Sequence, residues 1–214
     1  MESSRGNRAP ALLEAARDLF FERGYSGTTM DLVSRRAGLS KRTVYLYFKN
    51  KDDLFLAVAS QGLEQLQASL EDVDVDGLDY EEAVETIMER YIRFAGDEPE
   101  YFRFVFHDAT QSMITNASEP VRERIAHQER ACLRVPARVV EKGIAEGIVP
   151  VVDPMEAAIV FWGTVTGIIL LSLGGSQTVL PDNRPDIIRQ AVWVLYHGFK
   201  NLPGQAWQSA AGAS

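Results

Sequence analysis

Apolar residues recur at three- and four-residue spacing along most of the chain, which is the period of an amphipathic α-helix, and strand-like alternation is weak throughout. The first such segment opens at Pro10, a favourable first position of a helix, and closes at Gly24, as a C-terminal glycine does. The hydrophobic pattern therefore predicts an all-α protein.

Two short helices are predicted at 30–37 and 41–47, joined by the tight turn "AGLS". Ser40 is placed to cap the second, and Asn50 to cap a longer helix that runs to about Glu71. Two short helices across such a turn form a helix-turn-helix, whose second helix enters the major groove of DNA.

After the acidic turn "DVDVDGLD", helical periodicity returns. Pro136 is expected to kink the longest of these helices. The later segments with a helical pattern are 80–95, 99–115, 120–146, an apolar one that begins near Met155, and 185–201. The expected organisation is a flexible arm at 1–9, a DNA-binding domain at 10–57, an effector-binding and dimerisation domain at 58–203, and a flexible tail at 204–214.

Charge is distributed unevenly along this acidic chain, whose net charge is -8. Residues 1–55 carry ten Lys and Arg against seven Asp and Glu, whereas the remainder carries twelve against 23. Between Asp31 and Asp52 there are six basic residues and no acidic one. A basic front on an acidic body indicates that this part of the chain meets a polyanion.

The basic block suits a DNA-reading helix. Val44 is expected to point inward, which leaves Lys41, Arg42, Tyr45 and Leu46 outward. Arginine is the usual partner of guanine, and a leucine can touch a thymine methyl. On charge alone, a solvated basic helix face remains the alternative.

The stretch "GYSGTTMDLVSRRAGLSKRTVYLYFKNKDDLF" resembles the DNA-binding domain of the TetR family of transcriptional regulators, over roughly residues 10–57. The resemblance implies a homodimeric cytoplasmic regulator, most often a repressor, that binds a palindromic operator and is released by a small ligand. It also implies DNA contacts at Thr29, Lys41, Arg42, Thr43, Tyr45, Tyr47 and Lys51.

No charged residue occurs from Ala157 to Pro181, a stretch long enough to span a membrane. The alternative is a helix buried between its own domain and a second subunit, with Gly163 and Gly167 allowing close approach. TetR-like proteins dimerise through their last two long helices. The expected dimer residues are Val160, Gly163, Thr164, Gly167, Ile168, Leu171, Val192, Leu195, Tyr196 and Phe199.

The middle helices are expected, by the same resemblance, to enclose an effector pocket for an apolar or aromatic ligand. Aromatic residues are also common core residues, so the core is the competing interpretation for each. The expected ligand-binding residues are Tyr91, Phe106, His107, Met113, Ile125, Gln128 and Trp162.

Other chemistry finds little support in the sequence. His107, His127, Cys132 and His197 lack metal-ligand spacing, so no metal or other cofactor is expected. No phosphate-binding glycine loop, nucleophile elbow or paired His/Glu motif is present, so we do not expect an enzyme. A transcriptional activator, a ligand-independent DNA-binding protein and, more remotely, a helical enzyme remain as alternatives.

Overall fold

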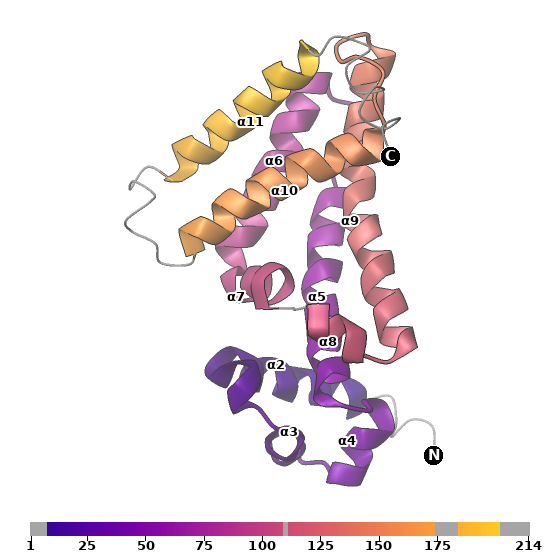
Figure 1. Cartoon of the computed structure of the whole chain (residues 1–214), viewed down its shortest axis with the longest axis vertical. Coiled ribbons are helices and arrows are strands. Elements are labelled where there is room, and N and C mark those ends of the chain that lie inside the picture. The colour runs from indigo at the N-terminus through magenta and orange to yellow at the C-terminus, as the bar shows by residue number, and fades with distance from the viewer. Residues whose placement is uncertain (1–7, 109–110, 174–183, 202–214) are drawn as a thin grey trace.

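The computed structural model describes residues 8–108, 111–173 and 184–201, and every regular element in these ranges is helical (Figure 1). The expected arm, tail and part of the apolar 157–181 stretch lie outside the described residues. In chain order the elements are α2 (Arg8–Gly27), α3 (Met30–Arg36), α4 (Lys41–Tyr47), α5 (Lys51–Glu71), α6 (Tyr80–Asp97), α7 (Pro99–Arg103), the π-helical turn η1 (Phe104–Asp108), α8 (Gln111–Asn116), α9 (Glu119–Ala145), α10 (Pro154–Leu173) and α11 (Arg184–Lys200).

The N-terminal helices form a small group at one end of the molecule (Figure 1). Gly24 leaves the helical conformation with a φ of 68°, so the regular part of α2 ends where the sequence predicts, before one last turn. The predicted cap Ser40 accepts a hydrogen bond from the backbone N–H of Thr43, and Thr29 accepts one from Leu32.

Helix α5 belongs to both halves of the molecule. Its first turns pack against α2, and the remainder packs against α6 and α9. The expected domain boundary at 57–58 therefore falls inside a continuous helix. This helix therefore connects the DNA-binding half to the effector half.

Asp53 joins the two halves at the start of α5. Its carboxylate, only 2% exposed, accepts hydrogen bonds from the backbone N–H of Lys49 at 3.2 Å and of Ser118 at 2.6 Å. Asn50, the cap of α5, accepts from the N–H of Asp53 at 2.7 Å and donates to the carbonyl of Asn116 at 3.1 Å. The end of the recognition segment is thereby tied to the turn between α8 and α9.

The prediction of one helix over 99–115 is wrong. The chain instead forms α7, the wider π turn η1 and the short helix α8, with residues 109–110 outside the described part. A π turn is a local insertion that changes which side chains share a face, and it often occurs at functional sites.

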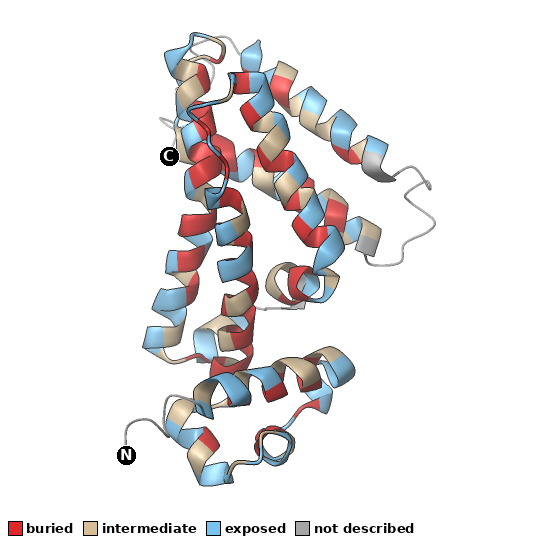
Figure 2. Ribbon diagram, turned by 180° about the vertical axis from the view of Figure 1, so that it is seen from behind, coloured by how far each residue is buried: buried red, intermediate tan, exposed pale blue. Residues whose placement is uncertain are grey.

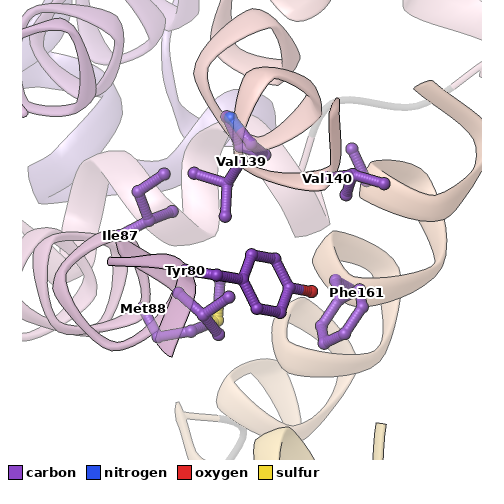
Figure 3. Close-up of a pocket in the computed structure, with 9 residues that line it drawn as sticks. Tyr80, Ile87, Met88, Val139, Val140 and Phe161 are labelled. Carbon is purple, nitrogen blue, oxygen red and sulfur yellow. The ribbon is translucent and has the colours of Figure 1, made fainter. Parts of the chain in front are cut away.

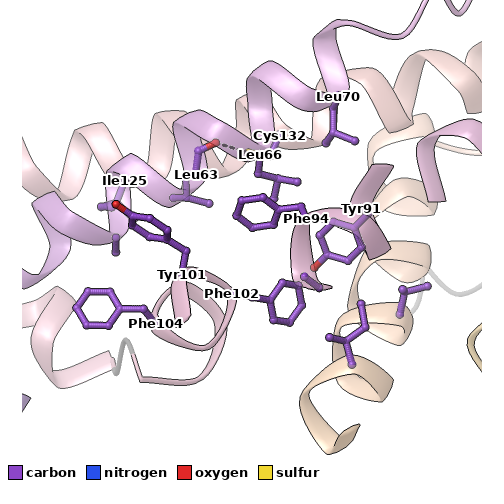
Figure 4. Packing of buried hydrophobic residues seen from close by; sticks show 14 of the residues in the cluster. Leu63, Leu66, Leu70, Tyr91, Phe94, Tyr101, Phe102, Phe104, Ile125 and Cys132 are labelled. Atoms are coloured by element: carbon purple, nitrogen blue, oxygen red, sulfur yellow. Dashed lines mark hydrogen bonds between the residues drawn. The ribbon is translucent and has the colours of Figure 1, made fainter. Parts of the chain in front are cut away.

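Neighbouring aromatic side chains of this segment face opposite halves of the molecule. Tyr101 and Phe104 pack on Phe21 of α2, with ring centroids 5.2 and 5.5 Å away. Phe106 packs on Tyr91 of α6 at 6.3 Å. The α7–η1 segment therefore contacts the DNA-binding group and the effector core at once. Figure 4 shows Phe102 on the same side as Phe94 and Tyr91 of the effector half.

The effector half is built on α5, α6, α9, α10 and α11, and its buried residues line the inner sides of these helices (Figure 2). Helix α9 continues through Pro136, whose missing N–H leaves the carbonyl of Cys132 without its usual helical partner. Helix α10 is long and apolar enough to cross a membrane by length and composition alone. It contacts α9 and α11, and 33% of its apolar window is buried in the protomer.

Asp53→Ala is expected to lower the free energy of unfolding by about 1–3 kcal/mol, because two backbone N–H groups lose a buried acceptor. Asp53→Asn keeps one acceptor oxygen and should cost less. Urea denaturation of the purified protein measures both. Glu119→Gln, at an exposed acid in the first turn of α9, is the matched control. Equal stability of Asp53→Ala and the control would contradict this role.

Candidate nucleic-acid interface and effector cavity

The second helix of the helix-turn-helix, α4, is held by a single inward contact. Val44 is its one buried residue and is completely inaccessible. Ser40 fixes the first turn through its bond to Thr43, and the two hydroxyl oxygens lie 2.8 Å apart. The remaining side chains of α4 are exposed or half-buried, as a helix that enters a groove requires.

Three exposed cations on this surface differ in their availability. Lys41 pairs with Asp31, with the ammonium nitrogen 2.7 Å from a carboxylate oxygen, and this hydrogen bond raises the pKa of Lys41. Arg36 makes a bidentate pair with Glu22 at 2.9 and 3.0 Å. Arg42 forms no hydrogen bond or ion pair with the described residues. DNA can therefore engage Arg42 without breaking an existing pair.

The polar side chains that are expected to contact DNA differ in how far they are exposed to solvent. Thr29 is exposed at the start of α3, although its hydroxyl already serves as a cap. Tyr45 is 45% exposed on α4, and Thr43 is half-buried. Tyr47 is half-buried against the core, so less of its ring is accessible to DNA.

Lys51 has an internal role that argues against the expected phosphate contact. Its ammonium group donates to the carbonyls of Tyr25 at 2.9 Å and Thr28 at 3.1 Å, and lies 3.8 Å from the centre of the Tyr25 ring. These contacts fasten the end of α2 to the start of α5. The sequence places Lys51 near the DNA face, but it could not show that its ammonium group donates to two backbone carbonyls.

The residues expected to bind a ligand divide between two places. Tyr91, Phe106 and Trp162 form one aromatic cluster, with ring centroids of Tyr91 and Trp162 4.4 Å apart. The Tyr91 hydroxyl is bonded to that of Thr166 at 2.6 Å, and burial raises the pKa of Tyr91. This cluster packs tightly as part of the core.

Met113, Ile125 and Gln128 lie instead where α8 and α9 cover α5, and all three are buried. The Gln128 amide is occupied at both ends, because it accepts from the Ser60 hydroxyl and donates to Glu64. The seventh expected residue, His107, has a side chain outside the described residues.

A cavity lies elsewhere, between α6, α9 and α10 (Figure 3). Its one polar side chain is Tyr80, which rests on Gly143 and stacks on Tyr196 with ring centroids 5.8 Å apart. The Tyr80 hydroxyl has no hydrogen-bond partner among the described residues, and burial raises the pKa of Tyr80 to about 12. The lining residues are Tyr80, Val84, Ile87, Met88, Pro136, Val139, Val140, Ala158 and Phe161.

The cavity volume is about 30 Å³, enough for one or two water molecules. None of the seven residues expected to bind a ligand lines it. A ligand larger than a few atoms therefore requires this cavity to widen.

The outer face of α10 and α11 is apolar and uncovered. Trp193 and Val194 are 63% and 60% exposed, and Leu171 is 51% exposed. A Cβ atom added at Gly163 or Gly167 would meet nothing within 4 Å, so the protomer itself does not require these glycines.

The ten expected dimer residues do not all lie on this face. Val160, Gly163, Thr164, Gly167 and Leu171 are exposed. Ile168, Val192 and Leu195 are half-buried. Tyr196 and Phe199 are buried in the protomer, because they stack on Tyr80 and Phe161. These two aromatics leave little surface for a second subunit.

Two family models match the chain in succession. Residues 12–58 match bacterial regulatory proteins of the tetR family, and residues 84–194 match the tetracyclin repressor-like C-terminal domain. The first match contains the helix-turn-helix, and the second contains most of the effector half.

Individual proteins agree with these matches. The chain is 29% identical over 158 residues to the uncharacterized HTH-type transcriptional regulator YhgD of Bacillus subtilis, covering 72% of this chain and 78% of YhgD. It is 30% identical over 110 residues to the HTH-type transcriptional activator FasR of Mycolicibacterium smegmatis, covering 49% and 50%. The crystal structure of the transcriptional regulator FadR from Bacillus subtilis in complex with stearoyl-CoA shares the fold, with a TM-score of 0.69 and 18% identity, covering 89% and 98%. The chain belongs to the TetR family of transcriptional regulators.

Proposed function

We propose that this protein is a homodimeric repressor, which binds a palindromic operator through two copies of α4 and is released by a small apolar ligand. The observation that carries the DNA-binding part is the exposed, acid-free outer face of α4, with Arg42 unpaired within the described chain. Phosphate contacts should dominate affinity and make it dependent on salt.

A second copy of the chain is the partner that fits the face of α10 and α11. This face exposes large apolar side chains, and its two glycines leave room for a neighbouring helix backbone. Isologous packing about a two-fold axis gives two recognition helices related by the same symmetry as a palindromic site.

The ligand site that we propose is the cavity between α6, α9 and α10, because its lining is apolar apart from Tyr80. The same helix α10 supplies Ala158 and Phe161 to the cavity and Gly163 and Gly167 to the proposed dimer face. A ligand that widens the cavity therefore shifts the helix that sets the distance between protomers. Only a ligand that binds the widened state better can shift the equilibrium.

Activation of transcription is the second candidate, and the similarity to the activator FasR favours it. Both modes use the same DNA-binding surface, so they differ in what the bound protein does to transcription. A reporter gene behind the selected operator separates them. Expression that rises when the regulator is deleted supports repression, and expression that falls supports activation.

Arg42→Ala is expected to weaken operator binding by about 1–3 kcal/mol, the worth of a good base contact, with an unchanged melting temperature. Lys51→Met should instead lower the free energy of unfolding by about 1–3 kcal/mol, because two backbone carbonyls lose a charged donor. Fluorescence anisotropy on the selected operator and thermal melting measure the two effects. Full DNA affinity in Arg42→Ala would remove Arg42 from the interface.

Gly167→Leu is expected to shift the protein from dimer to monomer, because a side chain there blocks the approach of a second helix. The protomer should remain folded, since the added atoms point into open space. Gly96→Leu is the matched control, because Gly96 is also exposed with nothing within 4 Å and lies on α6. Sedimentation velocity reads the outcome, and a dimeric Gly167→Leu protein would contradict the proposed interface.

Stearoyl-CoA, the ligand named for the FadR structure, is the first probe, because its acyl chain is the apolar group that the cavity would take. We expect it to lower operator affinity by about 5- to 150-fold in the wild-type protein, the usual range of allosteric coupling. Val84→Phe, which narrows the cavity, should keep operator affinity and lose the response. If stearoyl-CoA acts equally on both proteins, it binds elsewhere, and if it acts on neither, shorter acyl-CoAs are tested next.

A further inference from the structure

We propose that Leu46 determines sequence specificity by contacting the C5-methyl group of a thymine in each operator half-site. The inference rests on the proposed DNA-binding function and goes beyond it, since it assigns a base to one side chain. Leu46 has no polar atom in its side chain, so it can contribute nothing to phosphate binding.

The position of Leu46 on α4 is set by the buried residue two places earlier. Successive residues of an α-helix are about 100° apart, so Leu46 lies about 200° from Val44 and points away from the core. Its exposed fraction is 76%, the highest of the large apolar side chains in the described ranges. It also lies four residues after Arg42, which places both side chains on one face.

Scattered apolar residues are common on protein surfaces, so exposure alone carries no assignment. The surroundings of Leu46 are more informative. Its neighbours on the outer face of α4 are Lys41, Arg42 and Tyr45, all suited to polar contacts with DNA. In the major groove the thymine methyl is the apolar feature that a leucine can contact, whereas the other base edges present donors and acceptors.

A second protein copy does not account for this exposed side chain. The proposed dimer face lies on α10 and α11, at the opposite end of the molecule from α4 (Figure 1). Helix α4 packs against α3, and Leu46 and Tyr45 are exposed on its outward side. DNA is therefore the surface that α4 is placed to meet.

The experiment is a cycle of two changes on one operator, obtained by selection from random DNA. Leu46→Ala removes the apolar side chain, and replacement of thymine by deoxyuridine removes only the methyl group. Each thymine pair related by the palindrome is replaced in turn, and affinity is measured by fluorescence anisotropy for wild-type, Leu46→Ala and Arg42→Ala proteins. Melting temperatures confirm folding, which an exposed side chain should not alter.

At one thymine position, deoxyuridine should weaken wild-type binding by about fourfold per half-site, the effect of one methyl-sized group. Leu46→Ala should bind the thymine and deoxyuridine operators equally. Arg42→Ala, although weaker overall, should keep the wild-type ratio. Selection with Leu46→Ala should lose the preference for thymine at that position alone.

The proposal is overturned if deoxyuridine has the same effect on wild-type and Leu46→Ala proteins at every thymine. It is also overturned if Leu46→Ala selects the same operator with unchanged base preferences. Failure of the proposed function would look different. In that case the wild-type protein would recover no common sequence in the selection, and the cycle would have no operator to start from.

Discussion

The carboxylate of Asp53 is the interaction on which the relation between the two halves depends. A buried charge is tolerated only when hydrogen bonds replace its lost hydration. Asp53 meets that requirement with the backbone of Lys49, just after the recognition helix, and of Ser118, just before α9. Loss of either N–H donor would leave a carboxylate oxygen of Asp53 without this hydrogen bond. The end of the recognition segment and the start of α9 are therefore held by the same side chain.

A second connection runs through aromatic rings. In the segment after α7, Phe104 packs toward the DNA-binding group and Phe106 toward the effector core. Close-packed rings transmit displacement because a core has no free volume to absorb it. Both connections involve helix α5, because Asp53 belongs to it and Phe104 stacks on its Phe55. The effector half is therefore joined to the segment that follows α4 by both ring contacts and hydrogen bonds.

The DNA face is less positively charged than its composition indicates. Lys51 is committed to two carbonyls, and Lys41 and Arg36 are already paired with carboxylates. Exposed ion pairs are worth little, so phosphates can displace Asp31 and Glu22 at modest cost. Lys51 is half-buried, and its release would break the contact between α2 and α5. Charge counted along a sequence thus overstates what a surface can offer to DNA.

The sequence alone determined the helical class, the caps at Ser40 and Asn50, and the residues of the helix-turn-helix, because these depend on contacts within a few residues. Local patterns also placed the break at Gly24 and the outward direction of Arg42 and Leu46. The tertiary structure decided the rest. The segment expected as one helix over 99–115 is divided into α7, a π turn and α8, and its aromatic residues pack against two different halves of the molecule. Gln128, which the sequence predicts as a ligand contact, bonds Ser60 and Glu64, which lie more than sixty residues away in the chain. The cavity formed around Tyr80 because Gly143, on another helix, leaves room for its ring, a contact between distant residues that no periodicity records.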